Sequence, residues 1–193
     1  MNCLNKNIIN CFSNSDVNFD TLDGLIEDYI INHKTYLDKD INYYKGINLE
    51  KAILYSVFGK TDKRKKHPHQ YRLKNSLLDL VSKLILENKK QLLLCKSFDE
   101  ILTCINKITK STKGFGPLAI YDTSLRIASN LGYMPEKIYL HCGTFIGAKN
   151  LGLNIKKGYL YTDELPREFY KINEVDIEAC LCIYKDKLKF FTF

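Results

Sequence analysis

The chain has 193 residues, 45% of them hydrophobic and 26% charged, with a net charge of +7. This composition predicts one compact soluble domain that buries its core without the help of disulfide bonds or structural metal ions. The seven cysteines follow no regular spacing, so we expect reduced thiols. No apolar run approaches the roughly 20 residues that span a membrane, and we expect no membrane partner. The Asn-rich N-terminus is unlike a signal peptide, so we expect a cytoplasmic location.

Apolar residues recur at helical spacing along most of the chain, which predicts a mainly α fold. We expect helices over residues 19–37, 49–58, 71–93, 97–108 and 117–132, and a further one over 174–184. Gly59 and Gly132 are natural helix stops, and Ser97 with Glu100 has the pattern of a capping box. No Pro-, Gly- or Ser-rich linker divides the chain, so we predict a single helical domain over residues 1–193, with residues 1–16 flexible.

The C-terminal third allows two interpretations at two places. Residues 138–141 fit either a helix that begins at Pro135 or a short strand. Asn173 is a suitable N-cap for a helix over 174–184, whereas residues 180–193 also fit a short β-hairpin. Residues 138–152 are rich in glycine, which indicates close packing, either between helices of this chain or on a protein partner.

Residues 60–74, KTDKRKKHPHQYRLK, make the protein basic, because five lysines and two arginines stand there against one aspartate. Clustered Lys and Arg side chains neutralise phosphates and release counterions. The segment therefore predicts contact with a nucleic acid, with a plain solvated loop as the alternative. The phosphate contacts that we expect from it are Lys63, Arg64, Lys65, Lys66 and Arg72.

A Gly-Phe-Gly turn at residues 114–116 opens the helix over 117–132. Glycine can take a positive φ or let another backbone approach closely, and Pro117 suits the first helical position. The free N–H groups of such a helix end favour an anion. Lys113, Gly114 and Gly116 are therefore expected phosphate contacts, and the alternative is an ordinary corner between two helices.

The order helix, Gly-Phe-Gly turn, helix over residues 97–132 resembles the helix-hairpin-helix DNA-binding motif, although Thr112 and Lys113 stand where that motif usually has Leu-Pro. The resemblance implies that N–H groups of the turn hold a phosphate of duplex DNA without reading its sequence. Residues 122–132, DTSLRIASNLG, are similar to the Asp-Thr-His-Val-x-Arg-Ile-x-x-Arg-Leu-Gly block of the helix-hairpin-helix DNA glycosylases. This second resemblance implies that Asp122 is a catalytic carboxylate that helps to expel a flipped base. The two resemblances compete, because the glycosylases place their aspartate farther beyond the hairpin.

Asp122 also fits a structural role, since Arg126 follows at the i+4 position of an exposed ion pair. His67 and His69 could ligate zinc, but a structural site needs four ligands and no nearby cysteine pair supplies the others. We therefore predict no metal and no cofactor. His69 is instead a candidate general acid or base, since the neighbouring cations would favour its neutral form. Besides DNA repair chemistry and a non-catalytic protein-interaction module, a third hypothesis is an enzyme that uses His67, His69, Arg72 and Asp122 on a small phosphorylated substrate.

Overall fold

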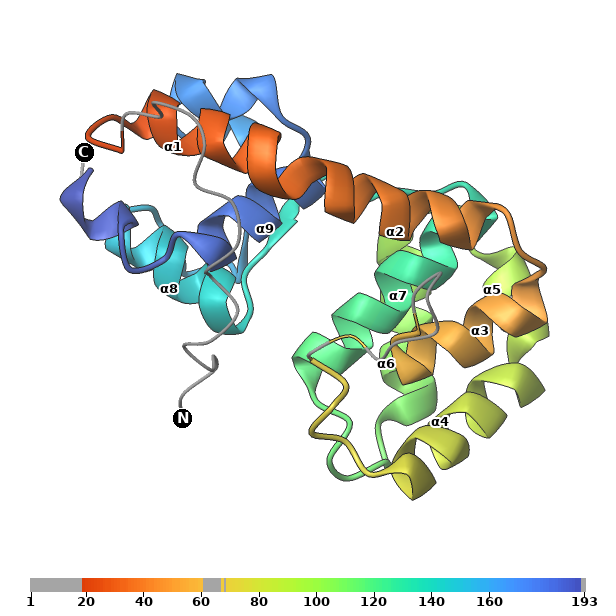
Figure 1. Ribbon diagram of the computed structural model, residues 1–193. Coiled ribbons are helices and arrows are strands. Elements are labelled where there is room, and N and C mark those ends of the chain that lie inside the picture. Colours follow the sequence, from red (N-terminus) through yellow and green to blue (C-terminus); the bar gives the residue numbers. More distant parts are fainter. Residues whose placement is uncertain (1–18, 61–66, 68, 192–193) are drawn as a thin grey trace. The chain divides into compact units, whose positions relative to one another are not determined.

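The computed structural model of the chain (Figure 1) describes residues 19–60, 67 and 69–191. These residues form helices and one small antiparallel sheet, in which β1 (Ile138–Tyr139) pairs with β2 (Tyr159–Leu160). The predicted mainly α class is thereby confirmed. Across the described ranges, no helix is both long and apolar enough to cross a membrane. The flexibility predicted for residues 1–16 concerns a segment outside these ranges.

The chain packs as two compact units, one of Met1–Leu37 with Glu136–Phe193 and one of Asp38–Pro135. The first division falls inside helix α2 (Thr35–Lys45) and the second falls shortly before β1. Neither place has the composition of a linker, so no boundary is predicted from the sequence. The prediction of a single domain stays a prediction.

The unit of residues 38–135 is a bundle of helices, in which α7 (Pro117–Leu131) packs on α3 (Leu49–Phe58) and α6 (Phe98–Thr109) (Figure 1). Besides these helices and α2 it contains α4 (Asn75–Glu87) and α5 (Lys89–Leu94). Helix α4 packs on α3 and α6 as well. Because α7 is enclosed, Tyr121, Leu125 and Ala128 are all buried, and polar residues on this helix must find partners inside the unit.

Most helix ends in this unit follow from local chemistry. Gly59 and Gly132 end α3 and α7 with φ of 60° and 85°, the left-handed conformation that glycine takes at least cost. Ser97 caps α6, because its Oγ accepts the Glu100 N–H at 3.2 Å. The predicted helix over 71–93 starts four residues too early and ends within one residue of α5. It is interrupted at Asn88, which leaves the helical conformation and donates its side-chain amide to the Leu84 carbonyl at 2.9 Å.

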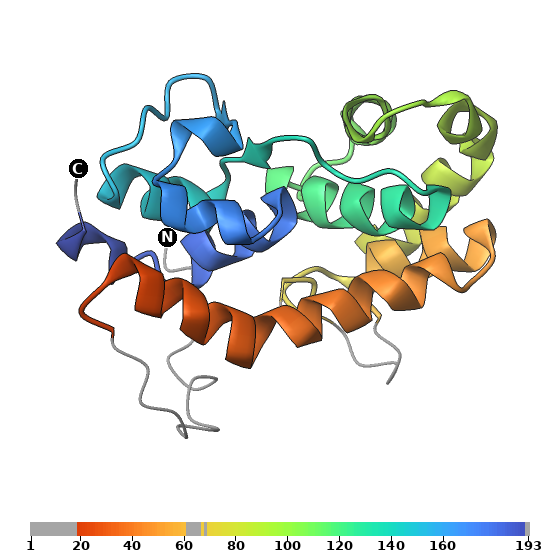
Figure 2. The ribbon, with the colours of Figure 1, turned by 90° about the horizontal axis from the view of Figure 1, so that it is seen from above.

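The other unit contains the helices that flank the small sheet. Its elements are α1 (Leu22–Tyr29), the π-helical turn η1 (Ile30–Lys34), α8 (Cys142–Asn150), α9 (Glu174–Ile183) and the 3-10 turns η2 (Thr162–Glu164), η3 (Arg167–Lys171) and η4 (Leu188–Phe190). Helices α8 and α9 lie side by side in both views (Figures 1 and 2). A Cβ on Gly147 would stand 2.1 Å from the Leu181 carbonyl oxygen. Gly147 therefore allows α8 and α9 to approach each other closely.

Both open alternatives in the C-terminal third are resolved. Residues 138–139 form a strand, because they pair with residues 159–160. The predicted helix from residue 174 is confirmed as α9, and the Asn173 side chain caps it by accepting the N–H groups of Val175 and Asp176 at 3.1 and 3.0 Å. The hairpin over residues 180–193 is wrong for the described part, where α9 continues to Ile183 and η4 follows. Its run of apolar residues fits a buried helix and a buried strand equally well.

Candidate functional site

Helix α7 begins at the predicted Gly-Phe-Gly turn and carries Asp122 in its second turn. Gly114 has a φ of +98°, as the sequence predicts for a glycine in a tight turn. Gly116 differs, because its φ of −84° and ψ of 177° are those of extended backbone. Phe115 between them is buried, so the turn is anchored in the core. A Cβ on Gly114 would lie 3.4 Å from the Leu77 side chain, which places the turn beside the first residues of α4.

His69 meets Asp122 although 53 residues separate them in the chain. The Nδ1 atom of His69 lies 2.9 Å from Oδ2 of Asp122, and Nε2 of Gln70 donates to the same oxygen at 3.4 Å. The Asp122 side chain is 12% exposed and that of His69 is 36% exposed. The carboxylate is therefore held inside the unit, while the imidazole above it can be reached from solvent.

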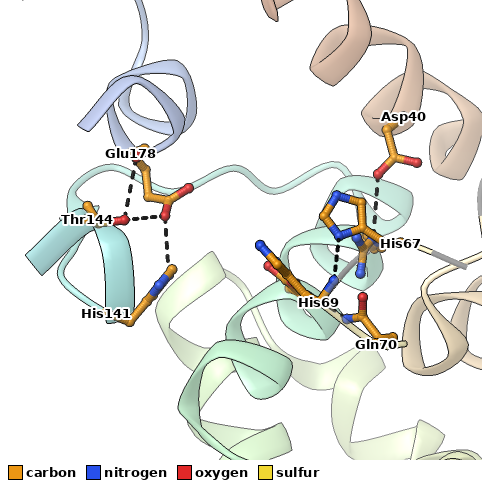
Figure 3. A network of polar contacts seen from close by, with 9 residues as sticks. Asp40, His67, His69, Gln70, His141, Thr144 and Glu178 are labelled. Carbon is orange, nitrogen blue, oxygen red and sulfur yellow. Dashed lines mark hydrogen bonds and ion pairs between the residues drawn. The ribbon is translucent and has the colours of Figure 1, made fainter. Parts of the chain in front are cut away.

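His67 completes a cluster with His69 and Asp122, which we call the His-His-Asp cluster. The ring centroids of His67 and His69 are 4.7 Å apart and the rings meet edge to face. Figure 3 shows both rings beside Gln70. One ligand atom from each of His67, His69 and Asp122 can be chosen so that all three lie within 4.8 Å of one another.

Neighbouring charges fix the ionisation of this cluster. Burial alone would raise the pKa of Asp122, but the hydrogen bond from His69 and the positive charge of Arg126 outweigh burial and lower the pKa to about 2. Burial, and then the charge of Arg126, lowers the pKa of His67 to about 3. At neutral pH Asp122 is therefore an anion and His67 a neutral imidazole.

Arg126 does not form the exposed ion pair with Asp122 that the i, i+4 spacing predicts. Its Nε lies 3.5 Å from Oδ2 of Asp40, and the two side chains are 7% and 13% exposed. Its guanidinium stands 6.0 Å from the centroid of the Tyr44 ring. The Nη1 atom of Arg126 is buried, with no hydrogen-bond partner in the part of the chain that the structure describes. The helical spacing was right about the face of α7 but not about the partner, which α2 supplies.

The structure describes only some of the expected phosphate contacts. Lys63, Arg64, Lys65 and Lys66 lie outside the described residues. Arg72 and Lys113 are exposed, as phosphate-binding side chains must be, and Gly114 and Gly116 are exposed too. The N-cap of α7 is Gly116, which has no side chain to bond the first N–H groups of the helix, and Ala119 in that first turn is buried.

Sequence reasoning did not assign Asp40 or Arg126 to the site, nor did it place Gln70 and His67 on Asp122. His67 was considered as a zinc ligand and, with His69, Arg72 and Asp122, as part of an enzyme site, whereas Gln70 was noticed only as a residue of the basic segment. Asp40 carries no motif at all, because an aspartate on an amphipathic helix is ordinary. A pairing over such sequence distances leaves no periodic signal.

A second polar group lies in the other unit (Figure 3). Thr144 donates to Oε1 of Glu178 at 2.5 Å, and Nε2 of His141 lies 3.5 Å from the same oxygen. In that unit Asp176 is also buried, and it accepts a hydrogen bond from the Tyr29 hydroxyl at 2.9 Å. These contacts tie α8 to α9 and α9 to α1, so they explain how the unit holds together.

Comparison of this chain with family models, with curated proteins and with solved structures finds no match. The chemistry of the site must therefore be inferred from its own residues.

Proposed function

We propose that this protein binds nucleic acid through its phosphates and cleaves a bond in it at Asp122 and His69. The observation that carries the proposal is the contact of His69 Nδ1 with Asp122 Oδ2 at 2.9 Å. It joins the end of the basic segment to the helix that the Gly-Phe-Gly turn opens. The basic segment and the Gly-Phe-Gly turn, which predict phosphate binding, thus belong to the same unit as Asp122 and His69, which predict catalysis.

The pair has the chemistry of an oriented general base. An ionised Asp122 favours the tautomer of His69 that carries its proton on Nδ1, and Nε2 is then the basic nitrogen. Such a nitrogen can take a proton from a water molecule that attacks a phosphorus atom, which breaks the P–O bond to a sugar oxygen, or the sugar carbon of a nucleotide, which breaks its bond to the base. The imidazolium can then return the proton to the leaving oxygen or base. Asp122 in turn stabilises the imidazolium that forms, which is the role of the carboxylate in a catalytic triad.

An extended substrate suits the imidazole of His69, because its side chain is 36% exposed and can be reached from solvent. An enzyme for a small molecule usually encloses most of its ligand in a pocket. A nucleic acid can instead be held by contacts away from the reacting atoms, and we assign these contacts to Arg72 and Lys113, which are both exposed.

Binding is tested first, with labelled duplex DNA, single-stranded DNA and RNA over a range of salt concentrations. If six phosphates are contacted, the slope of log K against log salt should be about −5 for duplex DNA. Arg72→Ala and Lys113→Ala should each weaken binding to all sequences alike and reduce the slope by about 1. The absence of binding to any of the three polymers at about 50 mM salt would refute the proposal.

Cleavage is tested on the same polymers, with and without damaged bases, by following released bases and broken strands separately. Asp122→Asn and His69→Gln should each lower the cleavage rate about 10²-fold or more, because each removes one member of the His69–Asp122 pair that acts as the general base. Asp79→Asn, on the exposed face of α4, is the matched control and should keep the wild-type rate. Base release would favour the glycosylase resemblance, and strand breakage alone would favour phosphodiester hydrolysis.

A further inference from the structure

The His-His-Asp cluster has the composition of a metal site as well as that of a base. Two imidazoles and one carboxylate come from two segments, the residues just before α4 and the second turn of α7. Catalytic zinc ions are commonly held by three such protein ligands, and the fourth position is left to water or substrate. Two histidines alone led us to predict no metal from the sequence, since nothing in the spacing showed that Asp122 would join them.

The distances leave little rearrangement to be made. Ligand atoms around a tetrahedral zinc ion lie roughly 3.3 Å apart, given bonds of about 2.0–2.1 Å. His69 Nδ1 and Asp122 Oδ2 are 2.9 Å apart, and all three ligand atoms fall within 4.8 Å. Asp122 is fixed on a buried helix, whereas His69 is exposed enough for its ring to turn. Side-chain rotation over about 1–2 Å would therefore complete the coordination.

The carboxylate of the cluster favours a cation. Asp122 is one of the three possible ligands, and Arg126, one helical turn farther on, pairs with Asp40 at 3.5 Å. Gln70 also donates to Asp122 at 3.4 Å. Such a bond from an outer residue orients a ligating carboxylate.

We propose that His67, His69 and Asp122 bind one Zn²⁺ ion with an open coordination position. Zinc is favoured because imidazole nitrogen and carboxylate oxygen suit it, whereas Mg²⁺ prefers oxygen ligands alone. The inference rests on the side chains of the proposed function but gives them another role when the ion is bound. Zn²⁺ would lower the pKa of a water molecule and supply hydroxide at neutral pH, in place of the water that His69 would activate in the metal-free protein.

The metal is tested without any nucleic acid, so that its outcome is independent of the proposed function. Metal-free full-length protein is titrated with Zn²⁺ by calorimetry and with Co²⁺ by visible absorption under reducing conditions. The expected result is one ion per chain with micromolar affinity or tighter, and a Co²⁺ spectrum without a thiolate charge-transfer band. That second readout excludes binding by the seven cysteines. A thiolate spectrum, or no binding, would overturn the inference.

Variants locate the ion. His67→Gln, His69→Gln and Asp122→Asn should each weaken Zn²⁺ binding by more than the 10- to 100-fold that loss of an outer-shell partner costs. His33→Gln, in the other unit, and Asp79→Asn are the controls and should leave affinity within about 2-fold. Circular dichroism of each variant checks that it folds. Folded variants of all three residues that bind Zn²⁺ like the wild type would refute the site.

Discussion

Replacing Asp122 by asparagine tests whether the buried carboxylate is held by its neighbours. Asparagine keeps the shape and can still accept the hydrogen bond from His69, but it carries no charge to balance Arg126. Asp122 has a folded pKa of about 2 against an ordinary value of 3.8, and one pKa unit corresponds to about 1.4 kcal/mol. The ionised carboxylate thus adds about 2 kcal/mol to the free energy of unfolding at neutral pH. Because its folded pKa is depressed, this contribution is complete above pH 4 and is lost as the pH falls towards 2.

The assay is urea unfolding of metal-free wild type and variants at pH 7, with EDTA present. Asp122→Asn should lose about 2 kcal/mol, whereas the exposed control Asp79→Asn should stay within about 0.5 kcal/mol. The double variant Asp122→Asn with His69→Gln should lose less than the sum of the two single losses, because the second change finds the contact already broken. An Asp122→Asn protein as stable as the wild type, or strictly additive losses, would refute the contact.

Three other predictions concern pH and backbone packing. His67 has a folded pKa of about 3, below the ordinary 6.5, so the unfolded chain takes up its proton first and the free energy of unfolding should fall as the pH drops from about 6.5 towards 3. In urea unfolding from pH 7 to 5, the free energy of unfolding should change less with pH for His67→Gln than for the wild type. An equal change in both proteins would contradict the burial of this imidazole. Gly114→Val should lower the free energy of unfolding by about 1–3 kcal/mol, because Gly114 has a φ of +98°. Gly116→Val should lower it by less than about 1 kcal/mol, since the Gly116 backbone is extended and a Cβ would meet nothing within 4 Å. Thermal unfolding that shows the reverse order would contradict this description of the turn. Gly147→Ala should lower the thermal midpoint, because its Cβ would press on the Leu181 carbonyl at 2.1 Å and overpacking costs about 1–3 kcal/mol, while the exposed control Lys149→Ala should melt with the wild type.

The helices of this protein are largely readable from local sequence. Capping by Ser97 and Asn173 and the stops at Gly59 and Gly132 depend on a few neighbouring residues, and they occur as predicted. The break at Asn88 was missed because the apolar spacing continues on both sides of it. Strand pairing of residues 138–139 could not be decided from sequence, since its partner is a segment about 20 residues farther along.

The candidate site was predicted by its residues and not by its contacts. Asp122 and His69 were selected for different reasons, one from a family-like block and one from a basic segment, and only the fold brings them to 2.9 Å. The pairing of Asp122 with Arg126 failed because spacing gives the face of a helix but not what packs on it. Asp40 reached Arg126 from another helix, and such a contact depends on tertiary packing alone.

The most direct measurement of the proposed centre is the imidazole spectrum of metal-free protein at neutral pH, by long-range ¹H–¹⁵N NMR. The chain has four histidines, so the signals of His69 can be identified by their loss in His69→Gln. We predict that His69 carries its proton on Nδ1 in the wild type and that Asp122→Ala abolishes this preference. A His69 with its proton on Nε2, or one that Asp122→Ala leaves unchanged, would contradict the existence of the pair on which the proposed chemistry depends.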